Sequence, residues 1–236
     1  MKATSTTYLI RILCCLLLTT ALTAQTAPQI LKPANEPPNL GELKKELKSY
    51  HDCTCACGCY AKDLDAQTQQ AMDFLNKRVA EKKPGEKLAM VLDIDETSLS
   101  NYPLMLREDF GYNPAESEEW DASGKAPAIP GTLRLYKRAQ ELGVAVFFIT
   151  GRRSPELAST EKNLRGQGYT NWTGLTLRAP DQAHMATIAY KSGERKKIEE
   201  QGYRIILSVG DQMSDLLGNP QAEMSVKLPN PYYYLP

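Results

Sequence analysis

The stretch Met90-Val91-Leu92-Asp93-Ile94-Asp95-Glu96-Thr97 places two aspartates one residue apart at the end of an apolar run. The run KLAMVLD, which begins at Lys87, predicts a buried strand. Side chains two residues apart on an extended segment face the same way, so Asp93 and Asp95 are expected to point into one crevice. Because two buried anions are costly without a cation, the stretch predicts a cation at this strand end.

Strands and helices alternate along the rest of the chain. Further strands are predicted for VAVFFITG and YRIILSVGD, and helices for residues 41–51, 62–82, 130–143, 154–168 and 192–202. The fourth helix is expected to begin with Ser154 as N-cap and Pro155 at the first helical position. This alternation predicts an α/β fold, with a Rossmann-type core whose parallel sheet is flanked by helices. The long stretch between the first strand and Gly131 predicts a small cap.

The composition limits the classes of partner. The chain has 28 basic and 28 acidic side chains, so no net field attracts a nucleic acid polymer or an anionic membrane. An anionic substrate must therefore be bound by a local group of side chains.

The N-terminal segment has the pattern of an export signal. Lys2 and Arg11 precede an apolar run from Ile12 to Leu22, which is followed by small residues. Because this run is too short to cross about 30 Å of hydrocarbon, residues 1–24 are predicted to be a cleaved signal peptide, with an uncleaved anchor or a lipid anchor as alternatives. We expect a periplasmic or extracellular protein with no stable membrane insertion after cleavage.

Four cysteines occupy alternate positions in HDCTCACGCY, namely Cys53, Cys55, Cys57 and Cys59. Exported cysteines normally pair, although such close spacing makes small rings. A thiolate site for zinc or copper and a redox role remain alternatives. Residues 25–60 are predicted to form a linker and an N-terminal helix with this cluster, and residues 61–236 to form the main domain.

Polar residues end three of the predicted strands. The first strand ends in Asp93, the second in Thr150-Gly151-Arg152 and the last in Gly210-Asp211. Ligands of parallel sheets bind beyond the carboxyl ends of the strands, so these groups are expected to converge. One carboxylate can attack phosphorus while the other protonates the leaving oxygen. Thr150, Lys191 and a metal bound through Asp211 would neutralise the phosphoryl charge, which predicts phosphoryl transfer through an aspartyl phosphate.

Four stretches in this order resemble a known family. They are VLDIDETSLSNYP, FFITGRR, YKSGERKKIEEQGYRI and SVGDQMSDLLG, and the closing KLPNPYYYLP looks like the end of the same proteins. The family is the haloacid dehalogenase (HAD) superfamily, and within it the secreted class B-type acid phosphatases of subfamily IIIB, which include plant vegetative storage proteins. The resemblance covers roughly residues 60 to 236.

The resemblance implies a role for each matched residue. Asp93 is the expected nucleophile, and Asp95 the general acid and base whose backbone carbonyl also meets Mg²⁺. The expected metal ligands are Asp93, Asp95 and Asp211, with Asp215 as a carboxylate behind them. Thr150, Gly151 and Lys191 are expected to bind the substrate phosphate, Thr97 to shape the first loop and Arg152 to touch substrate.

The sequence thus predicts an exported, Mg²⁺-dependent acid phosphatase that hydrolyses small phosphomonoesters. A nucleoside monophosphate phosphatase (5'-nucleotidase) and a catalytically silent storage or binding protein are the alternatives. A mildly acidic optimum is expected because Asp95 must carry a proton in the first step. His51 and His184 lie outside the matched motifs, which disfavours a histidine nucleophile. The sequence does not determine the physiological substrate and leaves a homodimer open.

Overall fold

The structure is a computed structural model that describes residue 31 and residues 33–55 and 59–235. The chain divides into two units, Met1–Pro37 and Pro38–Pro236, and the fold described here is that of the second. The predicted signal peptide, residues 1–24, lies outside the described residues. Among the helices of the described ranges, none has both the length and the hydropathy needed to cross a bilayer.

The described part of the chain contains a parallel sheet of five strands in the order β3-β2-β1-β4-β5. The strands are β1 (Lys87–Leu92), β2 (Ala145–Arg153), β3 (Gly174–Arg178), β4 (Tyr203–Gly210) and β5 (Met224–Lys227). In the centre of the sheet, Leu92 of β1 pairs with Phe148 of β2 on one side and Val209 of β4 on the other. The ends of these three strands are therefore neighbours, which confirms the predicted fold class.

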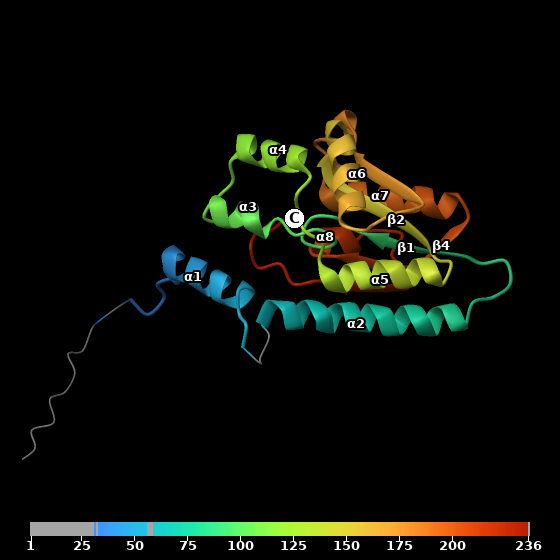
Figure 1. Ribbon diagram of the computed structural model, residues 1–236, viewed down its shortest axis with the longest axis horizontal. Coiled ribbons are helices and arrows are strands. Elements are labelled where there is room, and N and C mark those ends of the chain that lie inside the picture. The colour runs from blue at the N-terminus through green and yellow to red at the C-terminus, as the bar shows by residue number, and fades with distance from the viewer. Residues whose placement is uncertain (1–30, 32, 56–58, 236) are drawn as a thin grey trace, which may run out of the picture. The chain divides into compact units, whose positions relative to one another are not determined.

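Helices connect and cover the strands (Figure 1). They are α1 (Leu40–His51), α2 (Cys59–Ala80), α3 (Tyr102–Arg107), α4 (Pro114–Ser123), α5 (Pro130–Glu141), α6 (Leu157–Gly166), α7 (Thr187–Glu200) and α8 (Met213–Leu216). Figure 1 shows α2 and α5 packed side by side. The α3 and α4 helices belong to the stretch between β1 and α5, which we call the cap segment (residues 101–129).

Side chains of β1 alternate between two hydrophobic clusters, one on each face of the sheet. Met90 and Leu92 lie in the cluster that contains Leu75 of α2 and Leu135 of α5. Val91 lies in the other cluster, which contains Tyr190 of α7. The odd-numbered positions of β1 therefore face α7.

Asp93 extends the ladder by one residue, because its backbone N–H donates to the Val209 carbonyl at 3.0 Å. Since it shares the odd-numbered face of β1, its carboxylate is directed toward α7. This geometry explains why the first aspartate of the motif meets a side chain of that helix.

The start of α6 differs from the prediction. Ser154 does not act as the N-cap, because residues Ser154–Glu156 form a 3₁₀ turn and α6 begins at Leu157. The Glu156 carboxylate instead accepts from the Arg153 backbone N–H at 2.9 Å. Ser154 and Pro155 therefore begin a tight turn that precedes the helix.

Several short strands and helices were not predicted from the sequence, and one helix begins earlier than predicted. The short strands β3 and β5 and the cap helices α3 and α4 were not predicted, and α7 begins at Thr187 rather than at Ser192. Short strands and helices carry too few residues for a periodic pattern to emerge. The earlier start of α7 matters most, because it places Lys191 inside the helix.

Candidate active site

Three aspartates from the segments that follow β1 and β4 come together at the carboxyl edge of the sheet. One carboxylate oxygen each of Asp93, Asp211 and Asp215 lies within 4.8 Å of the others. Their exposed fractions are only 7%, 2% and 6%. Asp93 follows β1, whereas Asp211 and Asp215 follow β4, so the neighbouring strand ends bring them together as expected.

Lys191 is the cation among these carboxylates. It is 3% exposed, and its Nζ donates to Asp93, to Asp215 Oδ1 at 3.0 Å and to the Ile149 carbonyl at 2.6 Å. Burial by itself would lower the pKa of Lys191, but Asp215 and Asp93 outweigh it and raise the pKa, so the amine stays protonated. Lys191 therefore contacts Asp93 and Asp215 within the carboxylate cluster.

One ammonium does not balance three buried carboxylates. Burial raises the pKa of Asp93 well above its ordinary value; Asp215, Asp211 and Asp95 raise it further, and Lys191 opposes them. Burial and the charge of Asp215 likewise raise the pKa of Asp211. This excess of negative charge, carried by oxygen donors alone, fits a hard divalent cation.

Neutral groups orient Asp211 from several sides. Its Oδ1 accepts from Thr97 Oγ1 at 3.1 Å, and its Oδ2 accepts from Gln212 Nε2 at 2.8 Å and Asn230 Nδ2 at 2.7 Å. Such partners fix the direction of a carboxylate that ligates a metal. Thr97, which the resemblance implies shapes the first loop, thus also binds Asp211 directly. Asn230 is a further partner of Asp211 that the sequence did not identify.

Asp215 was expected to lie behind the metal ligands, but its carboxylate is part of the same cluster as those of Asp93 and Asp211. Its Oδ2 accepts from the Gln212 backbone N–H at 2.9 Å, while Oδ1 contacts Lys191. A Cβ at residue 210 would overlap the Asp215 side chain, so Gly210 provides the room for this approach. The buried Arg195 side chain donates to the Asp215 carbonyl at 2.6 Å and thereby supports the same loop.

Asp95 has a different environment. Arg152 Nη2 donates to its Oδ1 at 2.7 Å, Arg152 Nε lies 3.1 Å from both carboxylate oxygens, and Asn101 Nδ2 donates to Oδ1 at 2.8 Å. Burial would raise the pKa of Asp95, but Arg152 and Asn101 outweigh it and lower the pKa. The pKa values of Asp93 and Asp95 are therefore shifted in opposite directions.

The end of β2 lies beside Asp95. Thr150 is fully buried, and its Oγ1 donates to Asp95 Oδ2 at 3.5 Å and accepts from the Arg152 backbone N–H at 3.1 Å. Gly151 is exposed at the same end of the strand. The structure thus brings Thr150 and Arg152 to Asp95, and Lys191 to Asp93.

Two further residues link this loop to other parts of the chain. Glu96 is 1% exposed, accepts from the Asn101 backbone N–H at 2.6 Å and accepts from Tyr233 Oη at 2.8 Å. Burial, Asp95 and Asp211 raise the pKa of Glu96 to about 8. The cap segment and the C-terminal segment therefore both bind the loop that follows β1, and only the fold reveals these contacts.

Aromatic side chains pack beside this region. His51 stacks on Tyr102 and on Tyr60, and Tyr232 packs against both tyrosines and against Phe110. These contacts give His51 a packing role within the described residues. His184, the other histidine, is exposed.

The cysteine cluster lies between α1 and α2. The Sγ atoms of Cys53, Cys55 and Cys59 all lie within 4.8 Å of one another, and Cys55 is disulfide-bonded. Cys57 lies outside the described residues. A disulfide at Cys55 agrees with the first of the alternatives drawn from the sequence.

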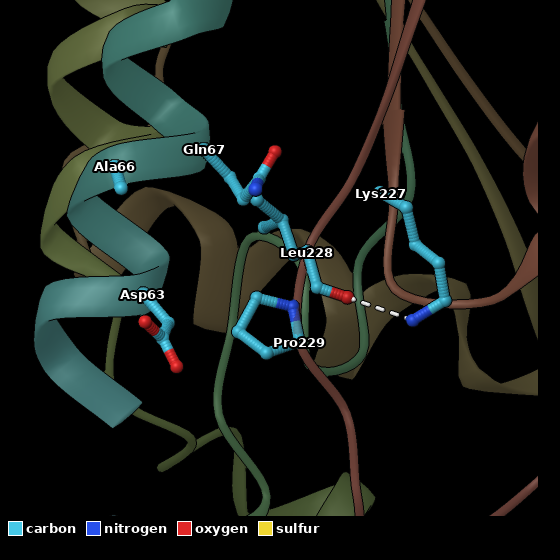
Figure 2. Close-up of a pocket in the computed structure, with 6 residues that line it drawn as sticks. All are labelled: Asp63, Ala66, Gln67, Lys227, Leu228 and Pro229. Atoms are coloured by element: carbon cyan, nitrogen blue, oxygen red, sulfur yellow. Dashed lines mark hydrogen bonds between the residues drawn. The ribbon is translucent and has the colours of Figure 1, made fainter. Parts of the chain in front are cut away.

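A separate pocket of about 250 Å³ lies between α2 and the segment after β5 (Figure 2). Its lining consists of Asp63, Ala66, Gln67, Lys227, Leu228 and Pro229. Lys227 Nζ donates to the Leu228 carbonyl at 3.1 Å across one side of it. Since none of the predicted site residues lines this pocket, it is distinct from the carboxylate site.

Comparisons with known proteins show the family of the chain. The family model of the HAD superfamily, subfamily IIIB (acid phosphatase), matches residues 19–236. The chain is 39% identical to the stem 28 kDa glycoprotein of Glycine max over 75% of this chain and 70% of that protein. It is also 39% identical to acid phosphatase 1 of Solanum lycopersicum over 61% of this chain, and spans 58% of that relative's length.

A vegetative storage protein and a solved structure extend these similarities. Vegetative storage protein 1 of Arabidopsis thaliana is 34% identical over 62% of this chain and 55% of its own. The class C acid phosphatase of Bacillus anthracis has the same fold, with a TM-score of 0.67 at 23% identity, covering 83% of this chain and 86% of its own. The family expected from the motifs is thereby confirmed: the chain belongs to the HAD superfamily, subfamily IIIB, an acid phosphatase family of phosphomonoester hydrolases.

Proposed function

We propose that the protein is an exported, Mg²⁺-dependent acid phosphatase that hydrolyses small phosphomonoesters through an aspartyl phosphate on Asp93. The observation that carries the proposal is the buried contact between Asp93 and Lys191 beside Asp211 and Asp215. Family membership supports the reaction class. The roles of individual residues rest on their motif positions and on these contacts.

In the first step a carboxylate oxygen of Asp93 attacks phosphorus and the bond to the ester oxygen breaks. Asp95 gives its proton to that oxygen, which leaves as an alcohol. Lys191 and the Thr150 hydroxyl stabilise the charge on the phosphoryl oxygens. Hydrogen bonds from Lys191 Nζ to Asp93 and to the Ile149 carbonyl position the ammonium group for this role.

In the second step a water molecule attacks the phosphorus of the aspartyl phosphate. Asp95, now ionised, takes a proton from that water, the bond between phosphorus and the Asp93 oxygen breaks, and inorganic phosphate is released. Asp95 is thereby protonated again and ready for the next substrate.

The carboxylates of Asp93 and Asp211 and the backbone carbonyl of Asp95 are the proposed Mg²⁺ ligands, with Asp215 supporting them. The excess of buried negative charge described above fits such an ion. When bound, Mg²⁺ would offset the repulsion between the carboxylates and the substrate phosphate.

The acid role of Asp95 requires a change in its surroundings. The ion pair with Arg152 lowers the pKa of Asp95 and so keeps it ionised. Transfer of the guanidinium from Asp95 to the substrate phosphate would let the Asp95 pKa rise. We therefore expect turnover to decline as the pH rises above neutrality.

Hydrolysis of 4-nitrophenyl phosphate, with Mg²⁺ or with a chelator, tests the proposal. Asp93→Asn should lower kcat at least about 10³-fold, because the nucleophile is gone. Asp65→Asn is the matched control, since Asp65 pairs with Arg134 on the surface. Undiminished turnover in Asp93→Asn would exclude the mechanism, and an inactive wild-type protein would favour a silent storage role.

The proposal includes export by residues 1–24, a linker and N-terminal helix with the cysteine cluster at residues 25–60, and a phosphatase domain at residues 61–236. Edman sequencing of protein recovered outside the cytoplasm would give the cleavage point. A mature protein that still begins at Met1 would contradict the signal peptide.

A further inference from the structure

Two adjacent arginines at the end of β2 bind the cap helix α4. Arg152 Nη2 lies 3.3 Å from Asp121 Oδ1, and Arg153 Nη2 lies 2.9 Å from Glu118 Oε1. The two acids are three residues apart, so they lie on one face of the helix. These ion pairs join the cap segment to the strand end that carries Thr150.

The two pairs differ in burial. The side chains of Arg153 and Glu118 are 60% and 63% exposed, so water screens their attraction. The side chains of Arg152 and Asp121 are only 4% and 23% exposed. The buried pair of Arg152 and Asp121 is therefore less screened by water and has the stronger electrostatic effect on the site.

The Arg152 guanidinium is shared between two carboxylates. The same Nη2 atom contacts Asp95 Oδ1 at 2.7 Å and Asp121 Oδ1 at 3.3 Å, while Nη1 donates to Thr160 Oγ1 at 3.4 Å. Its backbone N–H is bound to Thr150. A phosphate bound at Thr150 would reach a guanidinium whose Nε and Nη2 atoms already contact carboxylates of the protein.

We infer that Asp121 is a positioning residue that competes with the substrate phosphate for Arg152, and so couples occupancy of the phosphate site to docking of α4. The inference rests on the proposed function, because it assigns the phosphate to the Thr150 side of the site. Asp121 acts through Arg152 and does not itself touch the reacting atoms.

Competition for one guanidinium has reciprocal consequences. Phosphate that binds Arg152 weakens its hold on Asp121, and docking of Asp121 on Arg152 weakens phosphate binding by the same factor. Loss of Asp121 therefore strengthens phosphate binding. Among the described contacts, Asp95 is the one carboxylate that still binds the Arg152 guanidinium when Asp121 is removed. Phosphate then competes with Asp95 alone for the guanidinium. Because inorganic phosphate is also the product of the proposed reaction, its tighter binding slows its release and lowers kcat.

The test compares Asp121→Asn with the wild type and uses inorganic phosphate as the probe. Isothermal titration calorimetry at pH 7.5 should show about 5-fold tighter phosphate binding by Asp121→Asn. With 4-nitrophenyl phosphate, both KM and kcat should fall about 5-fold. A merely structural role predicts the opposite, namely weaker binding together with lower kcat.

Two variants complete the design. Asp121→Glu keeps the charge and should restore phosphate affinity and kcat to within about 2-fold of the wild type. Glu118→Gln also removes one negative charge from this face of α4. Because its partner Arg153 is exposed, the phosphate affinity and kcat of this variant should stay within about 2-fold of the wild type. Circular dichroism establishes that each variant is folded.

The calorimetric measurement separates this inference from the proposed function. If the wild type binds phosphate without hydrolysing esters, the proposed function fails while the affinity comparison still tests Asp121. Equal phosphate affinity of the wild type and Asp121→Asn would overturn the inference. So would an equal effect of Glu118→Gln, or a wild type that binds no phosphate.

Discussion

Asp93 lies in surroundings that favour its neutral form, because burial and three neighbouring carboxylates raise its pKa. An asparagine at this position mimics that neutral form. We therefore expect Asp93→Asn, in chelator at pH 7, to be at least as stable toward urea as the wild type although it has lost turnover. Clear destabilisation of the variant would mean that the ion pair with Lys191 contributes more than burial costs.

Asp121 provides a second test at the level of single residues. Burial raises its pKa from 3.8 to about 6; Arg152 and Arg153 oppose this shift, whereas Asp95 and Glu156 add to it. Below that pH the side chain is neutral and resembles asparagine, and above it the side chain is an anion that holds Arg152.

The difference in phosphate affinity between the wild type and Asp121→Asn should therefore be present at pH 7.5 and nearly absent at pH 5. Calorimetric titrations at both pH values check this. Because phosphate protonation affects both proteins alike, the ratio of their affinities isolates Asp121. A constant ratio across this range would show that Asp121 does not titrate there.

Among the elements, α2 and α5 approach each other closely at one glycine, Gly131. A methyl group on Gly131 would run into the side chain of Thr68, which is 3% exposed and donates to the Leu64 carbonyl at 2.9 Å. Gly131→Ala should lower the free energy of unfolding by about 1–3 kcal/mol.

Gly193→Ala is the control for that substitution. Gly193 lies within α7, and a Cβ there would meet nothing within 4 Å. Alanine should therefore stabilise the helix by about 0.5–1 kcal/mol. Urea unfolding of both variants measures the contrast, and equal effects would contradict the packing of α5 on α2.

For the whole molecule, the proposed Mg²⁺ site would link metal binding to folding. Its three aspartates come from the segments after β1 and β4 and approach one another only in the native fold. Mg²⁺ at about 100 times its Kd should add ~2.7 kcal/mol to stability and raise Tm. Asp211→Asn should lose most of this increase in a thermal scan, and an equal rise in both proteins would place the ion elsewhere.

The sequence identified the central part of the fold and most of the candidate site. Apolar runs marked β1, β2 and β4, because a buried strand needs a continuous apolar segment. The motif order led to Asp93, Thr150 and Lys191, and the structure brings Asp93 into contact with Lys191 and Thr150 to Asp95. Short elements such as β5 stayed hidden, since four residues carry no readable period.

Composition and periodicity alone would have left Lys191 on the surface, because it belongs to a charged helical run. Only the tertiary structure shows that the face of α7 that carries Lys191 packs toward β1. It also shows that Asp121, Asn230 and Tyr233 lie around the site. The physical reason is that periodicity reports which residues avoid water locally. Contacts between distant residues instead depend on how helices and loops pack across the sheet.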